Sequence, residues 1–339
     1  MQFTIIDKIS KAIPFKILQS FGKPKVLPLL YHVVGDAQNM PYLSGLYNVL
    51  KPEDFEKDLE FLLKNYTPID LESLVKYKQQ NLLPGKKKYF FLSFDDGLRP
   101  CSEIIAPILL RKGIPATFFI NTGFVGNQGF LHRFKAVLLS EAIRKDKSER
   151  LKHKLESFTN MQFSCRYKAA NYVKGLTFRQ TNTLQEAINY LEVDIERQLQ
   201  DYRPYMSKDE IGHLVSKGFT VGAHSEGHPE FYLLTEEEQL QQAGKSVETL
   251  IEWFNLPYSI FAFPFTDSGV KKSFFEKFNE IYKPDLTFAC AGLKNDPEKN
   301  HIQRIAMDNR YLQAENLLKS EYLHYFLKGL VGKRRVKRV

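Results

Sequence analysis

Short apolar runs alternate with segments of helical spacing along most of the chain, and this alternation restricts the fold more than any other feature. Residues 26 to 34 and 89 to 94 are apolar runs of strand length, and residues 52 to 65 between them repeat apolar side chains at helical spacing. Strands that are apolar along their whole length are typical of parallel sheets, which are covered on both faces. The order strand, helix, strand therefore predicts an α/β fold with a parallel sheet or barrel.

The same rhythm continues after residue 97, with one interruption. Between about 130 and 210 the pattern changes to long polar helices, predicted at 134 to 144 and 183 to 200, which we interpret as a helical insertion. Further strands and helices are predicted at 115–120, 218–223, 260–263, 286–289 and 302–305, and at 104–112, 236–254, 271–280 and 314–330.

The length of 339 residues and the hydrophobic content of 43% suit one barrel domain with insertions. We predict an N-terminal extension over residues 1 to 25 and a barrel over residues 26 to 310. A C-terminal helix with a basic tail occupies residues 311 to 339.

Two adjacent acids, Asp95 and Asp96, follow directly after the apolar run that ends at Phe94. An ionised carboxylate that leaves water needs a partner or a metal, so this position is costly without one. Neighbouring strand-end side chains point in different directions, and Gly97 allows a tight turn. One carboxylate can then bind a cation while the other acts as a base; the alternative is an acidic turn that caps a helix.

Two imidazoles, His224 and His228, lie four residues apart after another strand-like run. Two neutral imidazoles and one carboxylate make a three-ligand set with an open coordination position, as in catalytic zinc sites. Pro229 disfavours a helix through His228, which places the pair in a tight loop. An isolated pair of this spacing on the surface is the alternative.

These two clusters resemble the first two motifs of the polysaccharide deacetylases, the family-four carbohydrate esterases. The matching residues are Phe94-Asp95-Asp96-Gly97 and His224-Ser225-Glu226-Gly227-His228-Pro229. Residues 261 to 265 resemble the family's third motif without its arginine, and residues 30 to 32 resemble its first-strand signature. The resemblance implies a distorted (β/α) barrel and covers roughly residues 26 to 125 and 207 to 310.

The resemblance also implies roles for individual residues. Asp95 is the general base, the backbone N–H of Phe265 helps to bind the oxyanion, and Pro264 fixes the chain before it in the substrate site. The metal activates water and polarises the acetyl carbonyl. The expected cofactor is a divalent metal, zinc first, with cobalt, nickel or manganese as alternatives, held by Asp96, His224 and His228.

Two departures from the family pattern leave roles open. Ala262 stands where the third motif has an arginine that orients the base, and Arg304 is a candidate replacement, with a surface arginine as the alternative. The family's last motif, which supplies the general acid, has no match, because His324 lies in an expected helix. His32 is the first candidate for the acid and His301 the second; protonation by water, or weak activity, are the alternatives.

The resulting hypothesis is a metal-dependent hydrolase that removes N-acetyl groups, with O-acetyl groups as the alternative, from a saccharide precursor of surface polysaccharide or capsule. The alternative is a non-catalytic saccharide-binding protein that retains the metal site. An iron(II) oxygenase also uses two histidines and one carboxylate, but the acid pair disfavours it.

Localisation follows from weaker signals. Three separated cysteines favour a reducing compartment, and neither a secretion signal nor an apolar run of membrane-spanning length is found. We therefore expect a cytoplasmic protein, with a nucleotide-linked or lipid-linked substrate.

The net charge of +9 includes a basic tail at residues 333 to 339, which follows a helix with an apolar stripe. This end can contact the inner face of an anionic membrane, or the stripe packs on the barrel and the tail is solvated. Nucleic acid is not expected as a partner.

Overall fold

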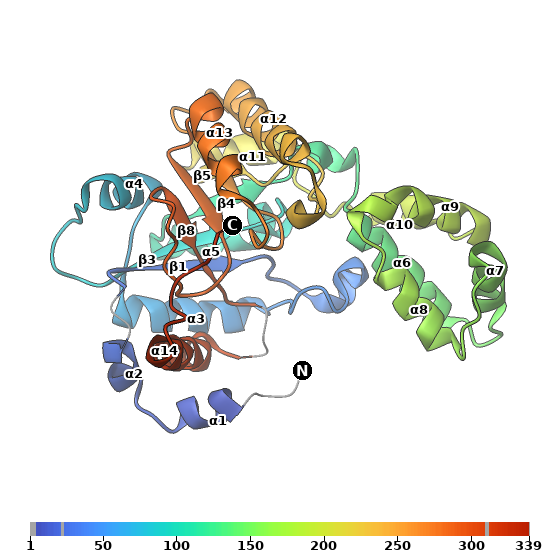
Figure 1. Ribbon diagram of the computed structural model, residues 1–339, viewed down its shortest axis with the longest axis horizontal. Helices are drawn as coiled ribbons and strands as arrows, with labels where there is room; N and C mark the ends of the chain where they lie inside the picture. The colour runs from blue at the N-terminus through green and yellow to red at the C-terminus, as the bar shows by residue number, and fades with distance from the viewer. Residues whose placement is uncertain (1–4, 22–23, 309–311, 339) are drawn as a thin grey trace.

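A barrel of parallel strands forms the centre of the protein in the computed structural model, which describes residues 5–21, 24–308 and 312–338 (Figure 1). Hydrogen bonds connect the strands in the order β8-β7-β6-β5-β4-β3-β1-β9, and β2 pairs with β3 outside this path. The strands are β1 (Val26–Tyr31), β2 (Thr67–Pro68), β3 (Tyr89–Phe94), β4 (Thr117–Ile120), β5 (Thr220–Ala223), β6 (Ile260–Ala262), β7 (Leu286–Ala289), β8 (His301–Gln303) and β9 (Ile305–Ala306).

The sheet closes on itself through one segment of chain. Only Arg304 separates β8 from β9, yet β8 pairs with β7 and β9 pairs with β1. The segment therefore joins the two edges of the sheet, which confirms the predicted distorted barrel. Because parallel strands point the same way, their carboxyl ends all meet at one end of the barrel.

The interior is packed with aromatic rings, as the apolar runs predicted. All six residues of β3 are buried. Phe91 stacks on Phe288 with a centroid separation of 5.6 Å, and Phe94 stacks on Phe118 at 5.2 Å. The first contact joins β3 to β7 and the second joins the neighbouring strands β3 and β4, and such contacts help to fix the positions of the residues at the strand ends.

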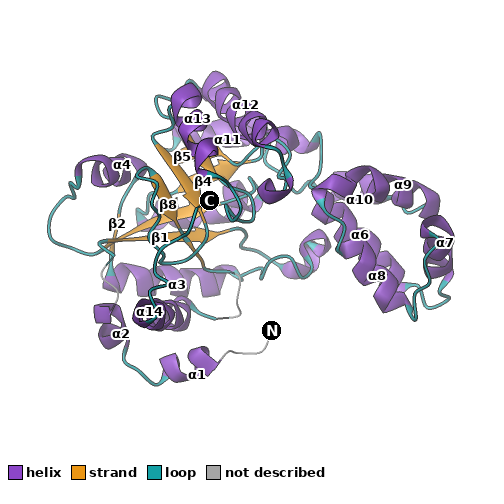
Figure 2. Cartoon of the chain, viewed as in Figure 1, coloured by secondary structure: helices purple, strands orange, loops and turns teal. Residues whose placement is uncertain are grey.

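Helices cover the outside of the barrel (Figure 2). The helix predicted at residues 52 to 65 has those bounds because Pro52 stands in its first turn, and the helix at 236 to 254 begins with a capping box of Thr235 and Glu238. The barrel helices are α3 (Pro52–Asn65), α4 (Leu71–Gln80), α5 (Ala106–Lys112), α11 (Lys208–Ser216), α12 (Glu236–Phe254) and α13 (Lys272–Tyr282). Short helical turns are η1 (Ala37–Asn39), η2 (Pro41–Leu43), η3 (Cys101–Ile105), η4 (Thr122–Asn127), η5 (Phe178–Gln180) and η6 (Phe231–Leu233).

Five helices form a separate lobe beside the barrel (Figure 1). They have a hydrophobic core of their own, which also takes in Tyr42 and Leu43 from the loop after β1. The single helix predicted at 183 to 200 is two helices, because Glu192 has a left-handed φ of 57° that ends the first. The lobe helices are α6 (His132–Lys145), α7 (Arg150–Thr159), α8 (Arg166–Lys174), α9 (Thr181–Leu191) and α10 (Ile195–Tyr202).

The two ends of the chain pack together. Helix α14 (Ala314–Leu330) lies against α1 (Ile5–Lys11), α2 (Phe15–Phe21) and α3. Its residues Leu317, Leu318 and Tyr322 are buried, so most of the predicted apolar stripe packs on the protein. No helix of the described chain is long and apolar enough to cross a membrane. The domain boundaries stay a prediction, and the one at 310 and 311 lies outside the described residues.

The expectation of a solvated basic tail is wrong for part of the tail. Arg335 bridges to Asn295 as a parallel strand partner, and the side chain of Arg338 is only 3% exposed. Arg338 Nη2 lies 2.6 Å from a carboxylate oxygen of both Asp267 and Asp296. These two buried carboxylates need a positive charge, and the tail supplies it.

Candidate metal centre and active site

The predicted site residues meet at the carboxyl end of the barrel. Asp95 and Asp96 follow β3, His224 follows β5, and His32 follows β1. A cavity of about 320 Å³, large enough for a sugar ring, opens among them. Its walls include the side chains of His32, Tyr47, Asp95, Leu131, Arg133, His224, His228, Phe263, Phe265 and Cys290.

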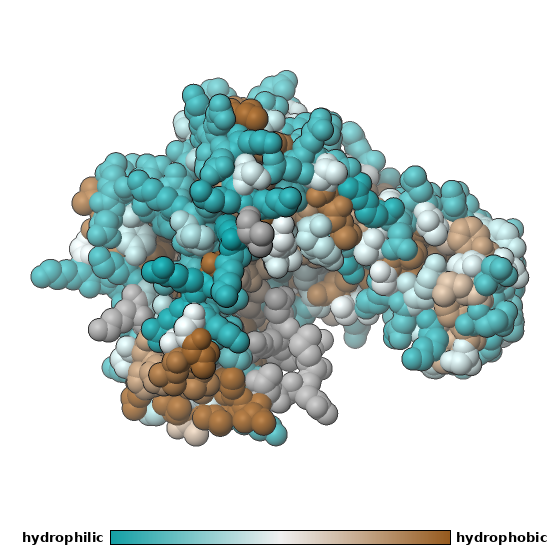
Figure 3. Space-filling view, viewed as in Figure 1, coloured by the Kyte–Doolittle hydropathy of each residue, from teal (hydrophilic) through white to brown (hydrophobic). Residues whose placement is uncertain are grey.

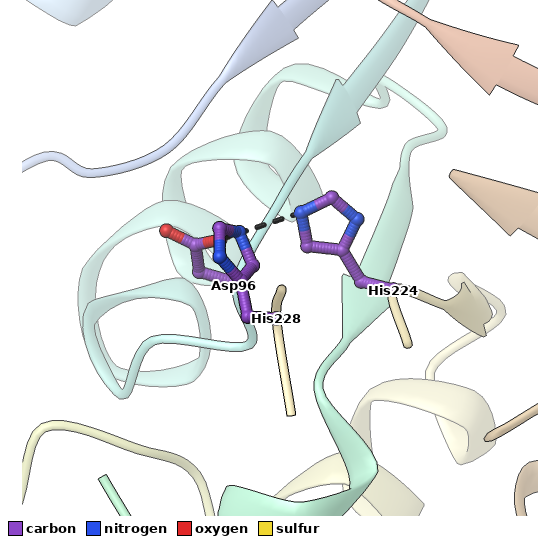
Figure 4. A group of neighbouring side chains, drawn as sticks. All are labelled: Asp96, His224 and His228. Carbon is purple, nitrogen blue, oxygen red and sulfur yellow. Dashed lines mark ion pairs between the residues drawn. The ribbon is translucent and has the colours of Figure 1, made fainter. Parts of the chain in front are cut away.

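Asp96, His224 and His228 present their ligand atoms to one point, as the spacing predicted (Figure 4). Asp96 Oδ1 lies 3.4 Å from His224 Nε2 and 3.1 Å from His228 Nε2, and all three residues are buried. His228 lies in a loop and not on a helix, which agrees with the effect expected of Pro229.

These three residues fit a divalent metal. His224 Nδ1 lies 2.8 Å from the carbonyl oxygen of Ala262, which can only accept, so Nδ1 carries the proton and Nε2 carries a lone pair. That lone pair faces Asp96 Oδ1, which is buried and accepts no hydrogen bond from the described residues. Two facing lone pairs repel each other unless a cation lies between them.

The backbone around the metal site is strained. Asp96, Ser225, His228 and Phe265 have φ values of 74°, 67°, 51° and 54°, in the left-handed region that non-glycine residues rarely adopt. Each such residue costs on the order of 1–3 kcal/mol, and the cost is accepted where the surroundings fix the conformation for a function. Here the conformation belongs to Asp96 and His228, which are two of the three candidate ligands, and to Phe265, which lines the cavity.

Arg304 binds Asp95, the other acid of the pair. Its Nη1 and Nη2 donate to the two carboxylate oxygens of Asp95 at 2.7 and 2.8 Å, and Nη1 also donates to Ser93 Oγ. Burial by itself raises the pKa of Asp95, but the charges of Arg304 and His224 outweigh burial and lower that pKa. Asp95 is therefore ionised, and Arg304 makes the arginine contact that Ala262, which has no polar side chain, cannot make.

His32 lies at the cavity with a buried acidic partner. Its Nδ1 is 3.0 Å from Oδ1 of Asp308, and its ring stacks on Tyr47 with a centroid separation of 4.2 Å. Burial lowers the pKa of His32, but the charge and hydrogen bond of Asp308, together with the charges of Asp96 and Asp95, outweigh burial and raise that pKa to about 9. A protonated His32 is what a general acid requires. His301, the second candidate, is buried beside Asp267 outside this cavity.

The sequence interpretation missed two residues that contact the predicted ones. Asp308, the partner of His32, ends the segment that carries Arg304. Tyr47 donates from its hydroxyl to Asp96 Oδ2 at 2.6 Å, which leaves Oδ1 to face the two imidazoles. Burial and the Asp96 charge raise the pKa of Tyr47 well above its ordinary value, so the hydroxyl keeps its proton. No motif marked Tyr47, because it lies in an irregular loop.

Phe265 and Arg133 form the side of the cavity nearest the helical lobe. The backbone N–H of Phe265 meets no acceptor within the described ranges, so it can bind a ligand oxygen. The ring centroids of Phe265 and His228 lie 4.5 Å apart. The guanidinium carbon of Arg133 lies 5.2 Å from the centroid of the Phe265 ring. Arg133 stands in the first turn of α6 and pairs with Glu230 at 2.6 Å, so the lobe contributes directly to the cavity wall.

Solved structures of similar fold include the following two. The Streptococcus pyogenes deacetylase PplD in complex with acetate is 15% identical with a TM-score of 0.54, over 87% of this chain and 97% of that one. IcaB from Ammonifex degensii is 14% identical with a TM-score of 0.52, over 88% of this chain and 96% of that one. These likenesses show a shared fold. A search of curated proteins found no match.

The family comparison rests on the chain's own sequence and not on its fold. Residues 83–273 match the sequence model of the polysaccharide deacetylase family. This range is more than half of the chain and includes the acid pair, the histidine pair and the segment that ends at Phe265. The chain therefore belongs to the polysaccharide deacetylase family.

Proposed function

We propose that this protein is a metal-dependent hydrolase that removes acetyl groups from the nitrogen atoms of an acetylated saccharide. The observation that carries the proposal is the division of the acid pair. Asp96 faces two imidazoles, while Asp95 is held by Arg304 beside the same cavity. One carboxylate is thus arranged as a ligand and its neighbour as a base.

A divalent metal bound by Asp96, His224 and His228 would polarise the acetyl carbonyl and favour ionisation of the attacking water. Zinc suits two imidazoles and one carboxylate, with cobalt, nickel and manganese as alternatives. The remaining chemistry belongs to the side chains and backbone of the cavity.

Asp95 removes a proton from the attacking water, and Arg304 fixes the direction of the carboxylate. The water oxygen bonds to the carbonyl carbon, and the Phe265 N–H donates to the oxyanion that forms. As the carbon–nitrogen bond breaks, His32 donates its proton to the departing amine. The products are acetate and a free amino sugar.

Three features support a saccharide as the substrate. The cavity has the volume of a ligand site, and it combines the rings of Phe265 and Tyr47 with polar groups. The Streptococcus pyogenes protein of similar fold was solved with acetate, the product expected here. We further propose a role in surface polysaccharide or capsule biosynthesis, in the cytoplasm, with O-acetyl groups as the alternative to N-acetyl groups.

The non-catalytic alternative depended on a missing general acid. His32 lies at the cavity, next to Asp308, and offers a proton donor where the sequence motif did not. We therefore favour an enzyme over a saccharide-binding protein.

The test is acetate release from N-acetylated oligosaccharides by the purified protein, together with its metal content. His224→Ala and His228→Ala should lose both the metal and turnover. Asp95→Asn should keep the metal and lose turnover by about 10²–10⁴-fold. Loss of metal in Asp95→Asn, with retention in Asp96→Asn, would show that the two roles are reversed. Saccharide binding without acetate release would favour the non-catalytic alternative.

A further inference from the structure

A group of exposed apolar side chains covers the surface where the two ends of the chain meet. We call it the terminal patch; Figure 3 shows it as apolar surface over α1, α2 and α14. Single exposed apolar residues are ordinary, but a group on three adjoining helices calls for a partner. The exposed members are Ile5 and Ile9 of α1, Ile17 and Phe21 of α2, and Leu327, Leu330 and Val331 at the end of α14.

The patch is a built surface and not a set of frayed ends. Helix α14 packs on both α1 and α2, and Phe21 stacks on Phe326 with a centroid separation of 4.6 Å. The opposite face of α14 is buried in the protein through Leu318 and Tyr322. The apolar side chains therefore face solvent on a surface that the fold holds in place. Ile5 is 77% exposed and Leu330 is 70% exposed.

The positive charge of the chain is concentrated in the same two segments. Residues 1–25 and 322–339 contain eleven lysines and arginines and one acidic residue, whereas the rest of the chain contains 37 basic and 38 acidic residues. The single acid, Asp7, is buried and accepts a hydrogen bond from Ser320. Exposed basic residues of these segments include Lys8, Lys16, Lys25, Lys333, Arg335 and Lys337.

We propose that the terminal patch docks the protein on an anionic lipid bilayer. Apolar side chains next to exposed lysines on the same helices, Lys8 beside Ile9 and Lys16 beside Ile17, match the boundary between acyl chains and anionic headgroups. A second copy of the chain fits less well, because a symmetric pair would bring two positive surfaces together. Nucleic acid is recognised mainly through phosphate contacts, which would leave the seven apolar side chains of the patch exposed to solvent.

This docking is peripheral, since α1 and α2 have seven residues each and α14 is anchored in the protein. It would keep the protein at a bilayer and favour a saccharide carried on a lipid. The preference for a lipid-linked saccharide rests on the proposed function, whereas the docking itself does not.

The sequence analysis expected membrane contact through the C-terminal helix and basic tail alone. The terminal patch differs, because helices from both ends of the chain form it.

The test is sedimentation of the full chain with phosphatidylcholine vesicles that contain phosphatidylglycerol, compared with phosphatidylcholine alone. We expect binding to the anionic vesicles and release in about 1 M salt, where the screening length falls to about 3 Å. Ile9→Glu and Leu330→Glu should each weaken binding by about tenfold. Lys8→Glu and Lys16→Glu should each weaken it by about fivefold or more.

The matched control is Ile281→Glu, on α13 at the opposite side of the barrel in Figure 1; Ile281 is 60% exposed. This variant should bind the vesicles as the unchanged protein does. All variants should keep the circular dichroism spectrum and hydrolyse a soluble substrate normally. Vesicle binding needs no turnover, so an inactive protein that still binds would contradict only the proposed function.

Three results would overturn the docking proposal. The first is equal binding to neutral and anionic vesicles, or none to either. The second is an equal effect of Ile281→Glu and Leu330→Glu. The third is a concentration-dependent dimer without lipid that Ile9→Glu abolishes, which would assign the patch to a second copy of the chain.

Discussion

Arg304 forms a bidentate ion pair with Asp95 inside the barrel, and it does so from the single residue that separates β8 from β9. The same segment that closes the barrel therefore also orients the proposed base. Arg304 is fully buried, and its guanidinium lies 5.1 Å from the ring centroid of Phe119. The planar fork of arginine matches both carboxylate oxygens, which a lysine cannot do.

Arg304→Lys should therefore impair turnover more than metal binding. Without the bidentate partner the pKa of Asp95 rises, so the acidic limb of the kcat/KM profile should move to higher pH, and kcat should fall by roughly 10²-fold. The measurement is the pH dependence of acetate release at constant metal content. Arg111→Lys, at an exposed ion pair with Glu56, is the control. An unchanged acidic limb would contradict the role given to Arg304.

Tyr47→Phe should weaken metal binding, although Tyr47 is not a ligand. The substitution keeps the ring that stacks on His32 and removes only the hydrogen bond to Asp96 Oδ2. Loss of such a supporting contact typically lowers metal affinity by about 10–100-fold. Competition with a chelator measures the metal Kd without any need for turnover. Tyr42→Phe, in the same loop, should leave the metal Kd unchanged, and equal Kd values for all three proteins would refute the role of Tyr47.

Asp308→Asn should remove most of the positive charge of His32 at neutral pH. Asp308 contributes most to the raised pKa of about 9, so in the variant burial lowers the pKa of His32 toward 6.5 against the smaller effects of Asp96 and Asp95. A raised pKa means that stability from this pair is fully present below pH 6.5 and is lost as pH rises through about 9.

NMR titration of His32 in the metal-free protein measures the shift directly. The basic limb of the kcat profile should move to lower pH in the same variant, because the acid loses its proton earlier. His32→Gln should remove that limb altogether. A His32 pKa that is equal with and without the Asp308 charge would contradict the pairing.

Arg338→Ala should destabilise the protein although it lies one residue from the end of the chain. The change leaves Asp267 and Asp296 buried without their cation, which typically costs about 3–5 kcal/mol. Urea unfolding measures the loss. Lys337→Ala is the matched control, since Lys337 is exposed next to Arg338. Equal unfolding midpoints for both variants would show that the tail contact adds nothing.

The cluster of Asp267, His301 and Arg338 also makes the free energy of unfolding depend on pH. Burial raises the pKa of Asp267, but His301 and Arg338 outweigh burial and hold that pKa well below its ordinary value. The stabilisation is therefore present above about pH 4 and lost as pH falls below it. In Arg338→Ala this dependence on acid should become weaker.

The sequence by itself determined the fold class and the metal-binding motifs. The alternation of apolar runs and helices depends on local periodicity, and each motif lies within six consecutive residues, so both can be detected without a structure. The sequence therefore placed the acid pair at the end of one strand, which is β3, and the histidines at the end of another, which is β5.

Only the tertiary structure decided which residues support that site. Asp95 and Arg304 are 209 residues apart, and His32 and Asp308 are 276 apart. Local periodicity carries no information about such pairs, because closure of the barrel is what brings them together. The same holds for Tyr47, whose loop has no regular pattern, and for Arg338. A charged tail has the same sequence whether it is solvated or buried. Arg338 is buried because the folded barrel places the carboxylates of Asp267 and Asp296 next to it.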